Sequence, residues 1–182
     1  SLDKLEKEIE RKRNWEDYEI PESLPLPERH REPNFLIPII GGFCIALILG
    51  SILAFLTFKK GYIIGLFEVG VGFAIGFIFK YLIRFSNYVD FKKLNYLLIG
   101  VIVLTYVANQ YFLYEFIINE YNYERLSFFE FIKIRFSEGL TIKSLNTGWI
   151  GLLISWVIQI GLTWLISYLR LAHNLTSYLL ER

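Results

Sequence analysis

Four long runs of apolar residues dominate the chain, and each is long enough to cross a lipid bilayer. As α-helices rising 1.5 Å per residue, such runs span a hydrocarbon core of roughly 30 Å. Lipid offers no hydrogen bonds to an open backbone, so a helix, which pairs its own N–H and C=O groups, is the expected conformation. The pattern therefore predicts an all-α, integral membrane four-helix bundle within residues 35–169. Its spans are expected at about residues 36–58, 62–79, 94–114 and 148–168.

The first 34 residues have a different pattern, in which charged positions surround a thin apolar stripe. Leu2, Leu5 and Ile9 recur at helical spacing, which predicts a short N-terminal amphipathic helix. The following stretch is rich in proline, which favours extended backbone and predicts a semi-rigid Pro-rich linker. We expect this arm, residues 1–34, to lie in the cytoplasm and to contact a cytoplasmic protein partner.

The connection between the third and fourth runs contains a second amphipathic pattern. Ser127 and Glu130 have the spacing of a capping box at a helix start, and Gly139 offers a helix stop. Aromatic residues gather on one side of the stretch between them. These features predict an outer interfacial helix lying in the membrane surface, and a lid on the bundle is the alternative.

Composition and charge add a location and an orientation. Hydrophobic residues make up 54% of the 182 residues and the mean hydropathy is +0.40, which is too apolar for an ordinary soluble domain. Most Lys and Arg lie in the N-terminal arm, in residues 80–93 and in the tail, residues 170–182. The positive-inside rule then predicts that both the N and C termini are cytoplasmic. The expected location is the cell inner membrane, with a multi-pass topology.

The sequence offers few residues for chemistry. Cys44 is the only cysteine and lies within an apolar run, so neither a disulfide nor a Cys-based metal site is expected within one chain. His30 and His173 have no second ligand at metal-binding spacing. We therefore expect no enzymatic activity, no catalytic residues, no metal, no cofactor and no nucleic-acid partner.

The second span carries a face of small residues. At 100° per residue, four of its five glycines fall on one side of the helix, and Gly70 lies opposite. Small residues let helices approach closely in lipid, so this helix-packing face is expected to contact another helix or another subunit. The glycines of this face are Gly61, Gly65, Gly72 and Gly76.

Glu68 falls in the middle of that face. A carboxylate inside the bilayer costs roughly 2.5 to 3.5 kcal/mol on insertion scales and needs a polar partner. In the four-helix topology its depth matches polar residues of spans three and four. We expect a polar intramembrane cluster, either as a structural hydrogen-bonded network or as an ion or proton site. The members of this cluster are Glu68, Asn109, Gln110, Ser155 and Gln159.

The second span also carries a family likeness. Its GYIIGLFEVGVGFAIGFIFKYLIR pattern resembles a group of small uncharacterised bacterial four-span inner-membrane proteins, which have a G-Y-x-I-G run followed by G-V-G-x-x-x-G. The likeness covers residues 35–168 and implies the fold and the compartment, without an activity. This chain departs from the pattern at Glu68, where the group has a small apolar residue.

Together these features predict a non-enzymatic multi-pass membrane subunit. It would oligomerise, or serve as an accessory or scaffold component of a membrane complex, with its glycine face as a contact in lipid. The alternative is an ion channel or pore-forming protein whose lining includes Glu68 and the polar residues of spans three and four. An intramembrane enzyme would need paired catalytic residues, which the sequence lacks.

Overall fold

A computed structural model describes residues 4, 6–7, 32–60, 65–121, 126–139, 141–142 and 145–181. Contacts divide the chain into two units, residues 1–30 and residues 31–182. Lys4, Glu6 and Lys7 are helical and exposed. The rest of the predicted amphipathic helix and nearly all of the Pro-rich linker lie outside the described residues, so everything below concerns the second unit.

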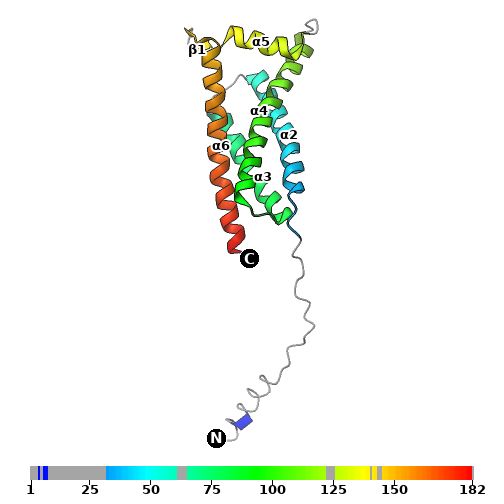
Figure 1. The fold of residues 1–182 in the computed structure, drawn as a ribbon, viewed down its shortest axis with the longest axis vertical. Helices are drawn as coiled ribbons and strands as arrows, with labels where there is room; N and C mark the ends of the chain where they lie inside the picture. The colour runs from blue at the N-terminus through cyan, green and yellow to red at the C-terminus, as the bar shows by residue number, and fades with distance from the viewer. Residues whose placement is uncertain are drawn as a thin grey trace. The chain divides into compact units, whose positions relative to one another are not determined.

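Five helices make up the described part of this second unit (Figure 1). Four of them are long and apolar enough to cross a membrane, which confirms the predicted number of long apolar helices. Between α5 and α6, the two-residue strands β1 (Thr141–Ile142) and β2 (Leu145–Asn146) pair antiparallel, which the sequence did not predict. The helices are α2 (Leu36–Lys60), α3 (Leu66–Ser86), α4 (Phe91–Tyr121), α5 (Phe128–Glu138) and α6 (Gly148–Leu180).

Local capping fixes several helix ends. The side-chain oxygen Oδ1 of Asn34 accepts the Leu36 N–H at 2.9 Å, and that of Asp90 accepts the Lys93 N–H at 3.2 Å. Both bonds satisfy N–H groups that a first helical turn leaves open. At the C-terminal end of α3, Asn87 adopts the left-handed conformation, with φ 54°, and its N–H donates to the Ile83 carbonyl. Asn tolerates this conformation better than most residues, so α3 ends there.

Two helices extend well beyond the predicted spans. α4 has 31 residues and α6 has 33 residues, so α6 is about 50 Å long. The tail, predicted as a separate segment from residue 170, continues α6 because no proline or glycine follows the apolar run to break it. Its end packs against the end of α3, since the Arg84 guanidinium bonds to the Glu181 carboxylate at 2.7 Å and the Tyr178 hydroxyl donates to Asn87 Oδ1.

The four long helices form two closely packed pairs, α2 with α4 and α3 with α6. Small residues hold α2 against α4. A Cβ added at Gly50 would lie 2.6 Å from the Ala108 Cβ and 2.8 Å from the Thr105 carbonyl oxygen. Backbones this close are typical of helix pairs in membranes. This face was not predicted, although its four-residue spacing is visible in the sequence: Pro38, Gly42, Ala46, Gly50 and Ala54.

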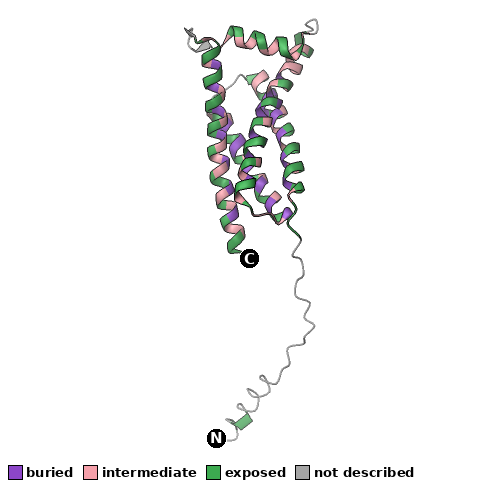
Figure 2. Ribbon diagram, viewed as in Figure 1, coloured by how far each residue is buried: buried purple, intermediate pink, exposed green. Residues whose placement is uncertain are grey.

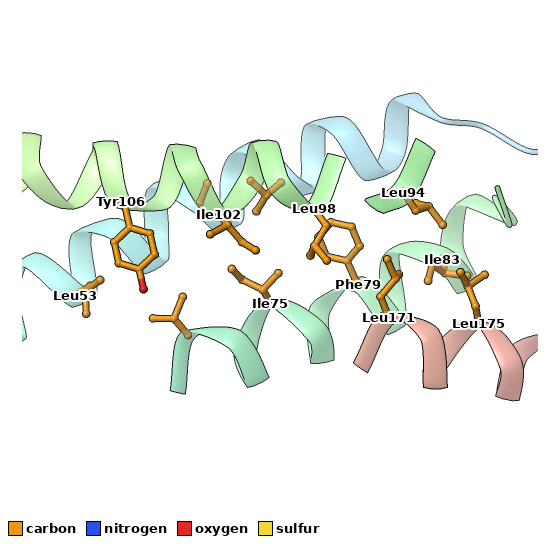
Figure 3. Close-up of a cluster of buried hydrophobic side chains, with 13 residues drawn as sticks. Leu53, Ile75, Phe79, Ile83, Leu94, Leu98, Ile102, Tyr106, Leu171 and Leu175 are labelled. Atoms are coloured by element: carbon orange, nitrogen blue, oxygen red, sulfur yellow. The ribbon is translucent and has the colours of Figure 1, made fainter. Parts of the chain in front are cut away.

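The buried residues concentrate on the inward sides of these helices (Figure 2). Many of the exposed residues are large and apolar. Part of the interior is filled by an apolar cluster (Figure 3). There, Ile75 and Phe79 of α3 pack with Leu98 and Ile102 of α4, and all four are completely buried. An apolar surface around a packed interior is what a bundle in lipid requires.

α5 lies across the end of the bundle, between the end of α4 and the start of α6 (Figure 1). The predicted capping box is confirmed, because the Glu130 carboxylate accepts the Ser127 N–H at 2.8 Å while Ser127 Oγ accepts the Glu130 N–H. The Ser127 N–H and the Ser127 hydroxyl both donate to the Glu130 carboxylate, and these two bonds lower the pKa of Glu130. The predicted stop is also confirmed, since Gly139 follows the last residue with φ 67°. Phe136 touches Trp156 of α6, with ring centroids 5.3 Å apart.

Candidate functional site: a polar face inside the bundle

The inward face of α6 carries a ladder of polar side chains. Because its members are four residues apart, they lie on one side of the helix. All four are buried. Ser155 and Gln159 were predicted, whereas the other two members were missed although they continue the same spacing. The polar ladder consists of Ser155, Gln159, Thr163 and Ser167.

Hydrogen bonds from this ladder connect α6 to both of its neighbours. Gln159 Nε2 donates to Ser155 Oγ at 2.9 Å within the ladder itself. The Thr163 hydroxyl lies 2.7 Å from the Tyr106 hydroxyl of α4, and Ser167 Oγ donates to the Gly72 carbonyl of α3 at 3.1 Å. Buried polar groups need such partners, so the ladder stabilises the interior.

The predicted glycine face divides into parts with different roles. A Cβ at Gly72 would lie 2.9 Å from the Ile166 Cβ, and a Cβ at Gly76 would lie 2.5 Å from the Arg170 Cβ. These two glycines therefore contact α6 of the same chain. Gly65 has φ 93° and nothing within 4 Å of an added Cβ, so it starts α3 and is not a packing contact. Gly61 lies outside the described residues.

Glu68 lies in the first turn of α3, because the helix begins at Leu66 and the predicted span began at residue 62. Its side chain is completely buried, and the carboxylate oxygen Oε2 accepts the backbone N–H of Gly65. A carboxylate is favoured at a helix N-terminus because the helix dipole is positive there and N–H groups are open. The carboxylate thus caps the start of α3.

The register of the α3 and α6 pair gives the depth of this carboxylate. The two helices run parallel, because Gly72 bonds to Ser167, Gly76 to Asn174 and Arg84 to Glu181. Glu68 precedes Gly72 by one turn, which brings it level with Thr163, one turn before Ser167. This register places Glu68 one turn from the predicted Gln159 and two turns from the predicted Ser155, so the fourth-span residue at its depth is Thr163.

The two predicted polar residues of α4 present unpaired oxygens. Asn109 is 3% exposed, and neither its Oδ1 atom nor the Oε1 atom of Gln110 has a hydrogen-bond partner within the described part of the chain. Leaving a buried acceptor unpaired costs about 1 to 3 kcal/mol. These two oxygens are therefore places where an additional donor would be stabilising.

Gln110 lines a cavity of about 110 Å³ between α4 and α6. A water molecule needs roughly 10 to 15 Å³ of such volume, so several waters or one small group fit there. The walls are mostly apolar with a few convergent polar groups, as is common for binding sites. We call this region the α4/α6 seam, and it is lined by Val103, Tyr106, Val107, Gln110, Trp156, Gln159 and Ile160.

Within the described ranges, no group of three His, Cys, Asp or Glu side chains lies close enough together to hold a metal ion. Fold and site together define a class, a multi-pass helical membrane protein with a polar face inside its bundle. Comparison with protein-family models, with curated proteins and with solved structures finds no match. The family likeness of the second span therefore stays a prediction.

Proposed function

We propose that this chain is a non-enzymatic membrane subunit that associates sideways, through the α4/α6 seam, with a second copy or with another membrane protein. One observation carries the proposal: Gln110 Oε1 has no partner among the described residues and lines a cavity between two membrane-spanning helices. Polar side chains on such helices form hydrogen bonds between subunits. This oxygen is buried in the single chain, so a rotation of the Gln110 side chain into the seam would bring it to a donor on a neighbouring helix.

The looser contact between α4 and α6, compared with the two closely packed helix pairs, supports the same proposal. α2 and α4 interlock through glycines, and α3 and α6 do so through Gly72 and Gly76. α4 and α6 contact each other less extensively and leave the seam between them. A helix packing into this seam would bury Val107, which is 53% exposed.

The proposal includes the orientation that was predicted from the distribution of Lys and Arg. With both termini in the cytoplasm of a cell with an inner membrane, the arm, residues 1–34, faces a cytoplasmic partner. The seam lies between the segments that cross the bilayer. The subunit would then join a partner in the membrane to a partner in the cytoplasm.

The proposal predicts that Gln110→Leu weakens association. Hydrogen bonds between membrane helices are worth about 0.6 kcal/mol on average and up to about 1.7 kcal/mol, so the dissociation constant should rise roughly threefold to eighteenfold. Native mass spectrometry of the purified full chain in mild detergent would measure the fraction of complex against concentration.

A pair of bulky variants separates this interface from a general effect on the surface. Val107→Trp fills the seam and should shift the chain toward monomer, whereas Ile48→Trp, on the exposed side of α2, should not. Equal behaviour of the two variants, or a chain that is monomeric and isolated at every concentration, would contradict the proposal.

A channel or pore is the second candidate, and the polar ladder of α6 favours it. Thr163 and Ser167 continue the line from Gln159 toward the C-terminal half of the bundle. The apolar cluster around Phe79 and Leu171 fills the adjoining interior of a single copy, so a pore would have to form between copies. Ion or proton flux into liposomes that is lost in Gln159→Leu would favour this candidate over the subunit.

A further inference from the structure

We propose that Arg170, with His173, binds the phosphate of an anionic phospholipid at the edge of the membrane. The apolar run of α6 ends at Leu169, and Arg170 follows directly. The apolar run of α3 ends in the same way, at Phe79 before Lys80. A cationic residue where an apolar helix leaves the hydrocarbon lies at the depth of lipid headgroups.

The neighbouring helix fixes the position of the Arg170 side chain. Its Cβ and Cγ atoms lie 2.5 and 3.0 Å from where a Gly76 Cβ would be, so the stem crosses α3 only because residue 76 has no side chain. The guanidinium carbon then lies 4.7 Å from the centre of the Phe73 ring. Stacking on an aromatic face orients the planar guanidinium and leaves its N–H edges open.

The charge on this guanidinium has no acidic partner in the described part of the chain. The ion pairs found there join Arg84 to Glu181 and Lys93 to Asp90. Arg170 is exposed, and His173, one turn further on the same side of α6, is exposed as well. An external anion would therefore meet two basic side chains.

A shallow hollow of about 390 Å³ surrounds these two side chains, and its walls explain why the anion belongs to a lipid. Phe73, Ile166 and Leu169 form the apolar part of the lining, beside Arg170 and His173. A free anion would make no favourable contact with the apolar side chains. A phospholipid matches both parts, because its phosphate accepts the paired N–H groups of arginine and its acyl chain covers the apolar side chains.

The experiment uses the purified full chain in nanodiscs of phosphatidylcholine containing a minor fraction of photoactivatable phosphatidylglycerol. The loss of a hydrogen bond between charged groups corresponds to a change of about tenfold or more. Arg170→Gln should therefore reduce photocrosslinking to phosphatidylglycerol about tenfold, while crosslinking to an equivalent phosphatidylcholine probe stays unchanged. Lys92→Gln, which removes an exposed charge at the start of α4, is the matched control and should have little effect.

A second variant tests the geometry without changing the charge. Gly76→Ala should displace the Arg170 stem and also reduce the crosslinking, provided that circular dichroism shows the helices intact. Equal crosslinking in Arg170→Gln and the wild type would overturn the proposal. Competition by millimolar inorganic phosphate, or equal crosslinking to both lipids in the wild type, would overturn it as well, because either result replaces an anionic lipid with another ligand.

Discussion

Glu68 shows what a single residue contributes when a helix begins inside an apolar segment. The sequence indicated correctly that this carboxylate would need a partner, since an unpaired charge in lipid is costly. The partner was not predictable, because the start of α3 depends on the positive φ of Gly65, and no polar residue marks that break. The side chain identified as a candidate ion site therefore has a structural role that the residue pattern does not display.

This capping role predicts the behaviour of two variants at position 68. Glu68→Gln keeps an oxygen that accepts the Gly65 N–H and should destabilise the bundle by less than about 1 kcal/mol. Glu68→Leu leaves that N–H unpaired and should cost about 1 to 3 kcal/mol. Unfolding of the detergent-solubilised protein by SDS titration would measure both, and a Gln variant as unstable as the Leu variant would show that the charge itself is required.

At the scale of helices, small residues decide which elements pair. The glycines of α3 were recognised in the sequence, and Gly72 and Gly76 do contact a neighbouring helix. The choice of α4 as the partner of α2 could not be inferred, because the apolar side chains of the three other spans are chemically alike. Only the spacing of Gly42, Ala46 and Gly50 distinguishes the buried side of α2.

Because α2 and α4 approach closely, the stability of the bundle should depend strongly on the space available at each glycine. Gly50→Leu would force its side chain against the backbone of α4, where an added Cβ already lies 2.8 Å from the Thr105 oxygen. Overpacking of this kind costs about 1 to 3 kcal/mol.

Gly70→Leu is the matched control, because nothing lies within 4 Å of an added Cβ there. Its effect should stay within about 0.5 kcal/mol. Thermal unfolding followed by circular dichroism compares the two. Similar losses would contradict the α2 and α4 pairing.

At the scale of the whole molecule, the number and order of the membrane helices were predictable from sequence. The reason is physical. A bilayer of fixed thickness demands long apolar runs, and in such a run an α-helix pairs the backbone N–H and C=O groups within the segment. Interactions across the interior were less predictable. Thr163 and Ser167 join helices through hydrogen bonds to Tyr106 and Gly72, and these partners are distant in the sequence.

A four-span bundle crosses the membrane four times, with α5 on one side of the membrane and the end of α6 on the other. Single cysteines introduced by Ser137→Cys and Thr176→Cys, in a Cys44→Ala background, report on these two positions, which are both exposed. The measurement is labelling of intact cells with a membrane-impermeant maleimide. We predict that Ser137→Cys reacts in intact cells and that Thr176→Cys reacts only after the membrane is opened. Labelling of both positions from the same side, or release of the chain by alkaline carbonate, would contradict the four-span bundle.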